Sequence, residues 1–484
     1  MGIVRYREEV MTVLMKTRSF VTTAIGTAVL AGLVSLPLGS AHGQDAHNMR
    51  LVGLDELQAR SAYQPIIQEH QNGRFIAYIG HHNGSAPNPL NGGATEINGT
   101  SIVDVTNPAR PVYLHHIQGD RGAQMVQTCS GDDLPQGDPG KMYLLRSNGN
   151  VSHEVWDVTD PSNPTFVSNA AFEAGANATH KNWWDCESGI AYIVYDGRQR
   201  EWRTNRLLWV VDLSDPADPV FLRNFGLVGQ EPGSTGDAPA GVHEVTKFGD
   251  RIYFAYGTGN DGIMQVVDDV DLLDCKFPDI CATAPMAEEL LEPQVGRVDM
   301  PTFWGAHTAF PVIGIDVPEQ EQFNDSSPRD FVVLVSESLA NECNENSHDM
   351  VFMVDITDET KPFPVANYQV AESEGDFCTE GGRFGAHSVN WSYNPDFYKK
   401  VVVISYFNAG VRAVDIRDPF HPKEVAFFIP DITANTAPRG DKFAIQTNNV
   451  EIDSRGFVYL ADRANTGLHI VELTGDAKKI VRNK

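Results

Sequence analysis

Residues 210–216 read Val-Val-Asp-Leu-Ser-Asp-Pro: an apolar run, an aspartate, one apolar residue, a polar pair and a proline. The same phrase recurs as Ile-Val-Asp-Val-Thr-Asn-Pro at 102–108, Val-Trp-Asp-Val-Thr-Asp-Pro at 155–161 and Ala-Val-Asp-Ile-Arg-Asp-Pro at 413–419. Runs of β-branched residues predict strands. The polar pair and proline predict a tight turn, because Asp and Asn side chains bond the nearby backbone and proline fixes φ. Each copy therefore predicts a strand, a turn and a second strand.

The repeat phrase continues along the chain. Residues 353–358 read Met-Val-Asp-Ile-Thr-Asp, a degraded copy lies at 266–268, and Ile-Val-Glu-Leu at 470–473 closes the series. Successive acidic residues of the phrase are 53, 55, 56, 87, 60 and 57 positions apart. A β-rich repeat of this length is what a four-stranded propeller blade needs. Seven copies predict an all-β, seven-bladed β-propeller, in which the phrase forms the third strand, its turn and the outer strand. The alternative is a β-sandwich array, whose strands do not repeat a whole unit in this way.

Composition agrees with this architecture. The 42 glycines and 28 prolines among 484 residues favour turns over long helices. Length alone suggests about three domains, whereas the repeat predicts a single domain over residues 44–484.

Lysine and arginine number 37 against 64 aspartates and glutamates, a net charge of −27. That balance argues against nucleic acid and anionic membrane surfaces as partners.

The N-terminus predicts an export signal. Lys16 and Arg18 precede an apolar run over residues 20–38, and small residues follow at 41–43. We expect a signal peptide over residues 1–43 and no transmembrane segment after its cleavage. The protein is then exported, either to a periplasm or to the extracellular or cell surface.

Cysteine usage fits an oxidising compartment. No C-x-x-C motif occurs, so a zinc ribbon or a thioredoxin-like site has no support. Alignment of the repeats favours one disulfide, and proximity in the sequence favours two others. The expected pairs are Cys129–Cys186, Cys275–Cys281 and Cys343–Cys378.

The repeat phrase resembles the LVIVD repeats of bacterial and archaeal exported or surface proteins, a family whose pattern implies a β-propeller. The likeness extends over most of residues 50–475, and the copies at 266–268 and 470–473 depart from it. The resemblance bears on architecture and says almost nothing about chemistry.

A histidine precedes a hydrophobic strand in four repeats. These residues, called the histidine row below, are His180, His243, His307 and His387. The innermost strand of each blade lines the channel of a propeller, so equivalent positions form a ring around the axis. Neutral imidazoles from consecutive blades would converge on a site suited to Fe, Cu or Zn. Channel-lining positions are also polar simply to bind water, so a structural role stays open.

The remaining repeats carry other residues at this position. An ungapped alignment of residues 243–262 with 448–467 puts Asn448 there in the seventh repeat. Gln127 and Gln64 lie near it in the second and first repeats.

Four further side chains are candidates for the site. Glu244 and Glu451 are candidates, by position, for carboxylates that fix the imidazole tautomers. His81 and His82 are expected in a loop at the same face, where they would contact a substrate.

The predicted ring resembles two kinds of metal propeller in its architecture. These are the carotenoid oxygenases, seven-bladed propellers that bind iron with four histidines, and the exported selenium-binding and methanethiol oxidase propellers. The resemblance implies a metal-dependent oxidoreductase acting on a small molecule. No G-x-S-x-G, H-E-x-x-H, P-loop or dinucleotide motif occurs, which argues against the common hydrolase, zincin and nucleotide-binding classes. The alternative is a non-catalytic periplasmic or cell-surface propeller that binds a surface partner.

Overall fold

The structure is a computed structural model that describes residues 45–274, 285–318, 327–344 and 349–483. These residues belong to one compact unit, residues 42–484. The described part of the chain is all-β, the class that the repeat predicts. The predicted signal peptide, residues 1–43, lies outside it. In the same ranges, no helix is long and apolar enough to cross a membrane.

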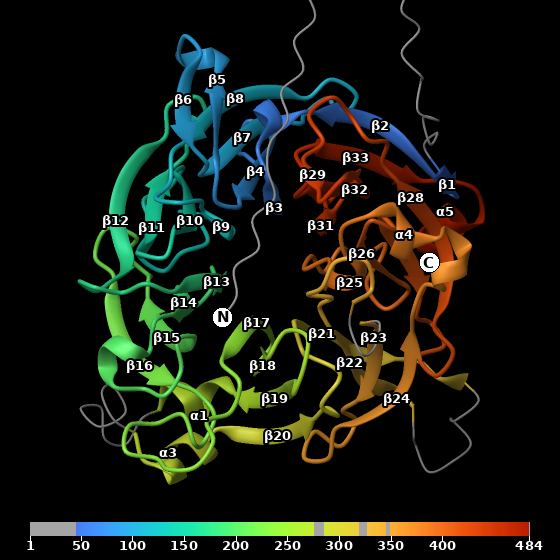
Figure 1. The fold of residues 1–484 in the computed structure, drawn as a ribbon. Helices are drawn as coiled ribbons and strands as arrows, with labels where there is room; N and C mark the ends of the chain where they lie inside the picture. The colour runs from blue at the N-terminus through green and yellow to red at the C-terminus, as the bar shows by residue number, and fades with distance from the viewer. Residues whose placement is uncertain (1–44, 275–284, 319–326, 345–348, 484) are drawn as a thin grey trace, which may run out of the picture. The chain divides into compact units, whose positions relative to one another are not determined.

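Five antiparallel sheets of four strands occur within the described ranges (Figure 1). The first two contain β3 (Ala62–Glu69), β4 (Phe75–His81), β7 (Thr100–Asp104) and β8 (Val112–Ile117), then β9 (Val126–Ser130), β10 (Met142–Asn148), β11 (Ser152–Asp157) and β12 (Thr165–Phe172). The third and fourth contain β13 (Thr179–Trp184), β14 (Ile190–Tyr195), β15 (Leu207–Asp212) and β16 (Val220–Phe225), then β17 (Val242–Phe248), β18 (Arg251–Tyr256), β19 (Ile263–Asp268) and β20 (Gln294–Asp299). The fifth contains β21 (Thr308–Ile315), β22 (Arg329–Val335), β23 (Val351–Asp355) and β24 (Phe363–Tyr368).

A larger sheet of nine strands follows. Its first part contains β25 (Phe384–Val389), β26 (Val401–Phe407), β27 (Val411–Asp415), β28 (Lys423–Ile429) and β1 (Asp45–His47). Its second part contains β31 (Thr447–Ile452), β32 (Phe457–Asp462), β33 (Gly467–Leu473) and β2 (Met49–Asp55). A single residue pair, Phe407 opposite Thr447, joins β26 to β31. The outer strand β2 comes from the start of the described chain, so strands from both ends share one sheet.

The smaller elements lie between these strands. They are α1 (Asp269–Leu273), α3 (Ala287–Leu291), α4 (Phe377–Glu380), α5 (Gly475–Arg482), and the short pairs β5 (Ser85–Asn88) with β6 (Ala94–Ile97) and β29 (Pro438–Arg439) with β30 (Lys442–Phe443). Helices α1 and α3 separate β19 from β20, which contributes to the long 87-residue step in the repeat.

The innermost strands contact one another in a closed circuit. In chain order β3, β9, β13, β17, β21, β25 and β31 each contact the next, and β31 contacts β3. Antiparallel sheets that repeat radially around a common centre form a β-propeller.

The repeat phrase forms the third strand of each sheet and the turn that follows, as predicted. In five copies the acidic residue that ends this strand accepts a hydrogen bond from the backbone N–H two residues later. The acceptors are Asp104, Asp157, Asp212, Asp355 and Asp415. These side chains satisfy turn N–H groups that would otherwise lack a partner in the sheet.

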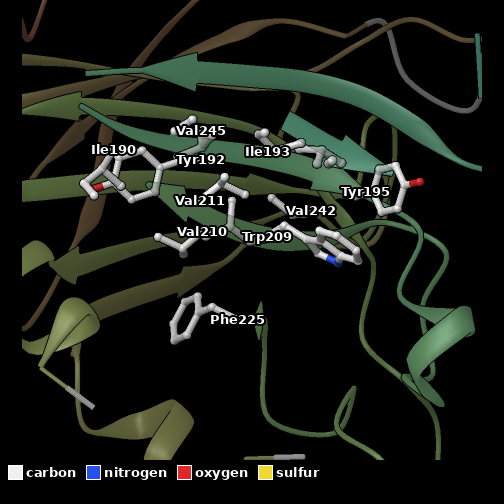
Figure 2. Close-up of a cluster of buried hydrophobic side chains, with 14 of the residues drawn as sticks. Ile190, Tyr192, Ile193, Tyr195, Trp209, Val210, Val211, Phe225, Val242 and Val245 are labelled. Atoms are coloured by element: carbon white, nitrogen blue, oxygen red, sulfur yellow. The ribbon is translucent and has the colours of Figure 1, made fainter. Parts of the chain in front are cut away.

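The core lies between neighbouring sheets (Figure 2). All residues of β14 are buried, because the strand has neighbours on both faces. Tyr192 and Trp209 belong to the same hydrophobic cluster as Val242 and Val245 of the following sheet. This packing explains why the middle strands are apolar at nearly every position.

Two of the expected disulfides lie in the described part of the chain. Cys129 in β9 bonds to Cys186, which follows β13, and so links two neighbouring sheets. Cys343 bonds to Cys378 of α4. The predicted Cys275–Cys281 pair lies outside the described residues.

Candidate metal centre

The histidine row lies where innermost strands begin, and three of its members lie at irregular steps in the pairing. Pairing between β13 and β14 jumps from Thr179 to Asn182, which leaves His180 in the step. His243 and His387 occupy the same kind of step in β17 and β25. His307 immediately precedes β21 and donates its backbone N–H to the Val335 carbonyl. Such bulges re-aim side chains, so the strand start is a suitable place for a site.

The four imidazoles form a continuous row of buried rings. Ring centroids lie 4.4 Å apart for His180 and His243, 4.0 Å for His243 and His307, and 4.3 Å for His307 and His387. The Nε2 atoms of His180 and His243 are 2.7 Å apart. Consecutive sheets therefore bring together all four histidines that the sequence singles out.

Hydrogen bonds assign the ring protons. His243 Nδ1 lies 3.0 Å from the His307 carbonyl oxygen, and His387 Nδ1 contacts the Asn448 carbonyl oxygen. A carbonyl oxygen only accepts, so both Nδ1 atoms donate and both Nε2 atoms keep a lone pair. His180 Nδ1 lies 3.0 Å from Gln124 Oε1, which gives the same tautomer. The Nε2 atoms of His180 and His243 thus face each other, and the Tyr63 hydroxyl lies 3.4 Å from His180 Nε2.

Burial keeps these imidazoles neutral. It lowers the pKa of all four histidines well below the ordinary value, and the charges of Arg206 and Lys181 lower the pKa of His180 and His243 further. Neutral imidazole is the form that binds metal ions. His307 Nε2 is buried and has no hydrogen-bond partner, which is costly for a polar atom unless something else binds it.

Two carboxylates complete potential metal-binding groups. Ligand atoms of His243, Glu244 and His307 lie within 4.8 Å of one another, and so do those of His307, Glu337 and His387. His180 belongs to neither group, and no group in the described ranges unites the four histidines. Glu337 Oε1 lies 3.6 Å from His387 Nε2, and its Oε2 lies 4.0 Å from His307 Nε2.

The two carboxylates differ in how their charge is balanced. Glu244 is fully buried and forms an ion pair with Lys181, whose Nζ lies 2.9 Å from Oε2. The Trp391 indole N–H donates to the other oxygen of Glu244 at 2.6 Å. Glu337 pairs with Arg383 through Oε1 at 2.8 Å, and its Oε2 faces His307. Burial raises the pKa of both carboxyl groups. Glu337 is therefore the carboxylate with an oxygen to spare for a metal ion.

The segment after β25 fills the channel beside the histidine row. Trp391 is buried against Trp183, with ring centroids 5.5 Å apart, and packs against the ammonium of Lys181. Tyr393 stacks on Phe310 and donates to the Lys247 carbonyl oxygen. These contacts reach β13, β17 and β21 and exclude water from that side of the row.

The remaining positions of the ring carry other side chains. Tyr63, one residue before the expected Gln64, lies beside the row, with its ring centroid 5.8 Å from that of His180 and 6.0 Å from that of His387. The difference arises because β3 also begins with an irregular pairing step, between Ala62 and Pro65. Gln127 pairs regularly opposite Leu145 in β9 and β10, which have no such step.

The other predicted residues lie around the row. His82 Nε2 lies 3.5 Å from Asn448 Oδ1, and its Nδ1 accepts from Gln124 at 2.8 Å. The expectation of a loop is wrong for His81, which is the last residue of β4, is fully buried and contacts the Ser101 hydroxyl at 2.7 Å within its own sheet. Glu451 accepts hydrogen bonds from the N–H groups of Trp391 and Ser392. Glu451 thus supports the segment that fills the channel.

Sequence reasoning missed several residues of the site. Glu337 follows a second strand, β22, where the repeat phrase gives no landmark. Tyr63 would have been found by aligning residues 62–65 with 179–182, since both stretches begin a bulged innermost strand. Lys181, Arg383 and Trp391 belong to no repeated pattern in the sequence, so sequence reasoning had no means of finding them.

Comparisons with known proteins bear on the architecture. The LVIVD repeat model matches residues 204–226, which contain β15 and β16, so the resemblance inferred from the sequence is confirmed there. No curated protein matches the chain. Among solved structures, the β-propeller domain of Cps50 (Swd1) from Myceliophteria thermophila is 10% identical, and the match covers 85% of this chain and 97% of that chain with a TM-score of 0.45. The matched LVIVD repeat lies in the third sheet of the propeller that the circuit of innermost strands forms.

Proposed function

We propose that this chain is an exported, single-domain, seven-bladed β-propeller whose histidine row binds a transition-metal ion for oxidoreductase chemistry on a small molecule. The blade count rests on dividing the nine-stranded sheet at its single Phe407–Thr447 pair. Each part then has an innermost strand of its own, β25 or β31, beside the five regular sheets. Export is supported by the two disulfides, since such bonds persist in oxidising compartments.

The observation that carries the metal proposal is the buried, unpartnered Nε2 of His307, which faces Glu337 Oε2 at 4.0 Å. His307, His387 and Glu337 are the ligand set we favour. Arg383 binds Oε1 of Glu337 and leaves Oε2 facing His307, whereas Lys181 and Trp391 bind both oxygens of Glu244. Two histidines and one carboxylate are typical of non-haem iron sites with open positions. In the broader version, His180 and His243 join His307 and His387 as a four-histidine set for Fe, Cu or Zn. A bound metal ion would supply Lewis-acid or redox chemistry.

The chain's own residues prepare the site for that role. Carbonyl acceptors hold the Nδ1 protons of His243 and His387, which directs their Nε2 lone pairs to the centre. Trp391 excludes water on one side, which strengthens electrostatic interactions in the site.

Metal analysis of the purified full-length protein tests the proposal. The wild type should contain bound transition metal after dialysis, whereas His307→Ala, His387→Ala and Glu337→Gln should each lose it. His180→Ala separates the two ligand sets, because it should retain metal with the three-residue set and lose it with four histidines. Asn448→Ala, which keeps the backbone carbonyl that His387 uses, is the matched control. Wild-type protein without metal would overturn the proposal and favour the non-catalytic binding propeller.

A further inference from the structure

A pocket of about 440 Å³ opens beside the histidine row, at the end where the innermost strands begin. It is called the arginine pocket here, because Arg121, Arg439 and Arg463 line it together with His82 and Gln124. No aspartate or glutamate of the described ranges lines it. In a chain with 64 acidic residues against 37 basic ones, a pocket whose charged lining residues are all arginines is unusual.

The pocket connects to the candidate metal centre through two side chains. Gln124 donates to His82 Nδ1 at 2.8 Å and accepts from His180 Nδ1 at 3.0 Å. The His82 ring packs edge-on against Tyr63 at 4.9 Å, and Tyr63 lies beside His180 and His387. A molecule in the pocket would therefore lie one side chain away from the histidine row.

The positive charge of the pocket is poorly compensated. Lys181 and Arg383 are paired with Glu244 and Glu337. Arg439 and Arg463 form no ion pair with any described residue, and the Arg439 Nε is buried without a hydrogen-bond partner. Asp462 attracts Arg439 electrostatically, but its carboxylate already accepts hydrogen bonds from the backbone N–H groups of Gln446 and Ala464.

Electrostatics agree with this geometry. Burial and repulsion from Arg383 and Arg439 outweigh the attraction to Glu337 and lower the pKa of Arg463 to about 10. Crowded guanidinium groups are unfavourable unless an anion lies among them. Planar guanidinium matches carboxylate and phosphate oxygens with paired hydrogen bonds.

We propose that the arginine pocket binds a small molecule through a carboxylate or phosphate group, held by Arg439 and Arg463. The volume suits a small ligand, since such pockets usually measure about 300–1,000 Å³. Gln124 and His82 provide polar contacts on the side toward the histidine row. Anion binding stands on its own, whereas the role of this molecule as the substrate rests on the proposed function.

Calorimetric titration of the purified full-length protein with inorganic phosphate and with succinate tests the proposal. The wild type should bind at least one of them. Binding of phosphate alone would assign the group as a phosphate, and binding of succinate alone would assign a carboxylate. Arg463→Gln should weaken binding by about tenfold or more, because a charge-assisted hydrogen bond is lost. Arg439→Gln is the second variant if Arg463→Gln does not fold.

Arg417→Gln is the matched control, since Arg417 is exposed and paired with Asp415 in the turn after β27. This control should bind the anion as the wild type does. Equal affinity in Arg463→Gln, or no binding to the wild type, would overturn the proposal. Loss of binding after chelation of metal would also overturn it, because the anion would then be a metal ligand.

The metal content of the variants separates this proposal from the proposed function. Arg463→Gln should keep its metal, and His387→Ala should lose metal while still binding the anion. An absence of anion binding would then leave the measured metal content unchanged. Likewise, an absence of bound metal would leave the anion affinity unchanged.

Discussion

The two sides of the central ring start from the same strand position and present opposite chemistry. On one side β13, β17, β21 and β25 contribute four neutral, buried imidazoles. On the other side β3 and β31 contribute Tyr63 and Asn448, while β29 and the turn after β32 add Arg439 and Arg463. The propeller requires an innermost strand in each sheet but does not fix which side chain stands at the start of that strand. The difference shows how one repeated backbone can hold neutral imidazoles beside a pocket lined by arginines.

The difference in charge balance between the two sides can be tested by removing one positive charge from each. Lys181→Met should destabilise the protein by about 3–5 kcal/mol, because it leaves the buried Glu244 carboxylate without its partner. Arg463→Gln should leave stability unchanged or raise it, because the repulsion from Arg383 and Arg439 that it relieves outweighs the attraction to Glu337 that it removes. Urea denaturation of both variants measures the two effects.

The double variant Lys181→Met with Glu244→Gln is the control for the first effect. It should recover part of the lost stability, since no charge stays buried. A loss in Arg463→Gln as large as that in Lys181→Met would show that the two sides do not differ in charge balance.

A smaller effect concerns Glu451, whose carboxyl group forms no ion pair with a basic side chain in the described ranges and accepts backbone hydrogen bonds instead. Burial raises the pKa of Glu451 from 4.5 to about 7. Between these values the folded protein keeps a proton that the unfolded chain releases, so this residue lowers stability as pH rises from 4.5 through about 7. The total amounts to about 3 kcal/mol.

Glu451→Gln should remove that part of the pH dependence. Thermal or urea unfolding across this pH range measures it in the variant and in the wild type. Identical pH profiles would mean that the carboxyl group titrates normally. Asp415→Asn, at an exposed turn, serves as a carboxylate control.

The smallest effects should be equal on both sides of the ring. Asp157→Ala and Asp415→Ala each remove a side chain that accepts a turn N–H after a third strand. Each should cost about 1 kcal/mol, as loss of a comparable capping interaction does. Unfolding midpoints of the two variants should agree, and a large disparity would show that the turns are not equivalent.

The architecture could be predicted because its signals are local. The repeat phrase carries both its strand and its turn, and the aspartates at 157, 212 and 415 make the turn bonds that their type implies. The histidine row could be predicted because the members share a position in the repeat. Tyr63 was missed because an irregular step at the start of β3 shifts the register by one residue.

Other parts of the site lay beyond sequence reasoning. Glu337 follows β22, outside the repeat phrase, and meets His387 only because β22 lies near β25 in the propeller. The pairing of Lys181 with Glu244 and Trp391 joins three sheets that are far apart in the sequence. Such contacts follow from the closure of the ring rather than from any spacing along the chain.

The sequence by itself determined the all-β class, the repeat and the four equivalent histidines, because periodic patterning and turn chemistry act over a few residues. The tertiary structure alone decided which carboxylates face the imidazoles, which ring nitrogens keep lone pairs and where unpaired arginines gather. Those properties depend on distance, burial and hydrogen-bond partners between blades. They exist only once the innermost strands have closed into a ring.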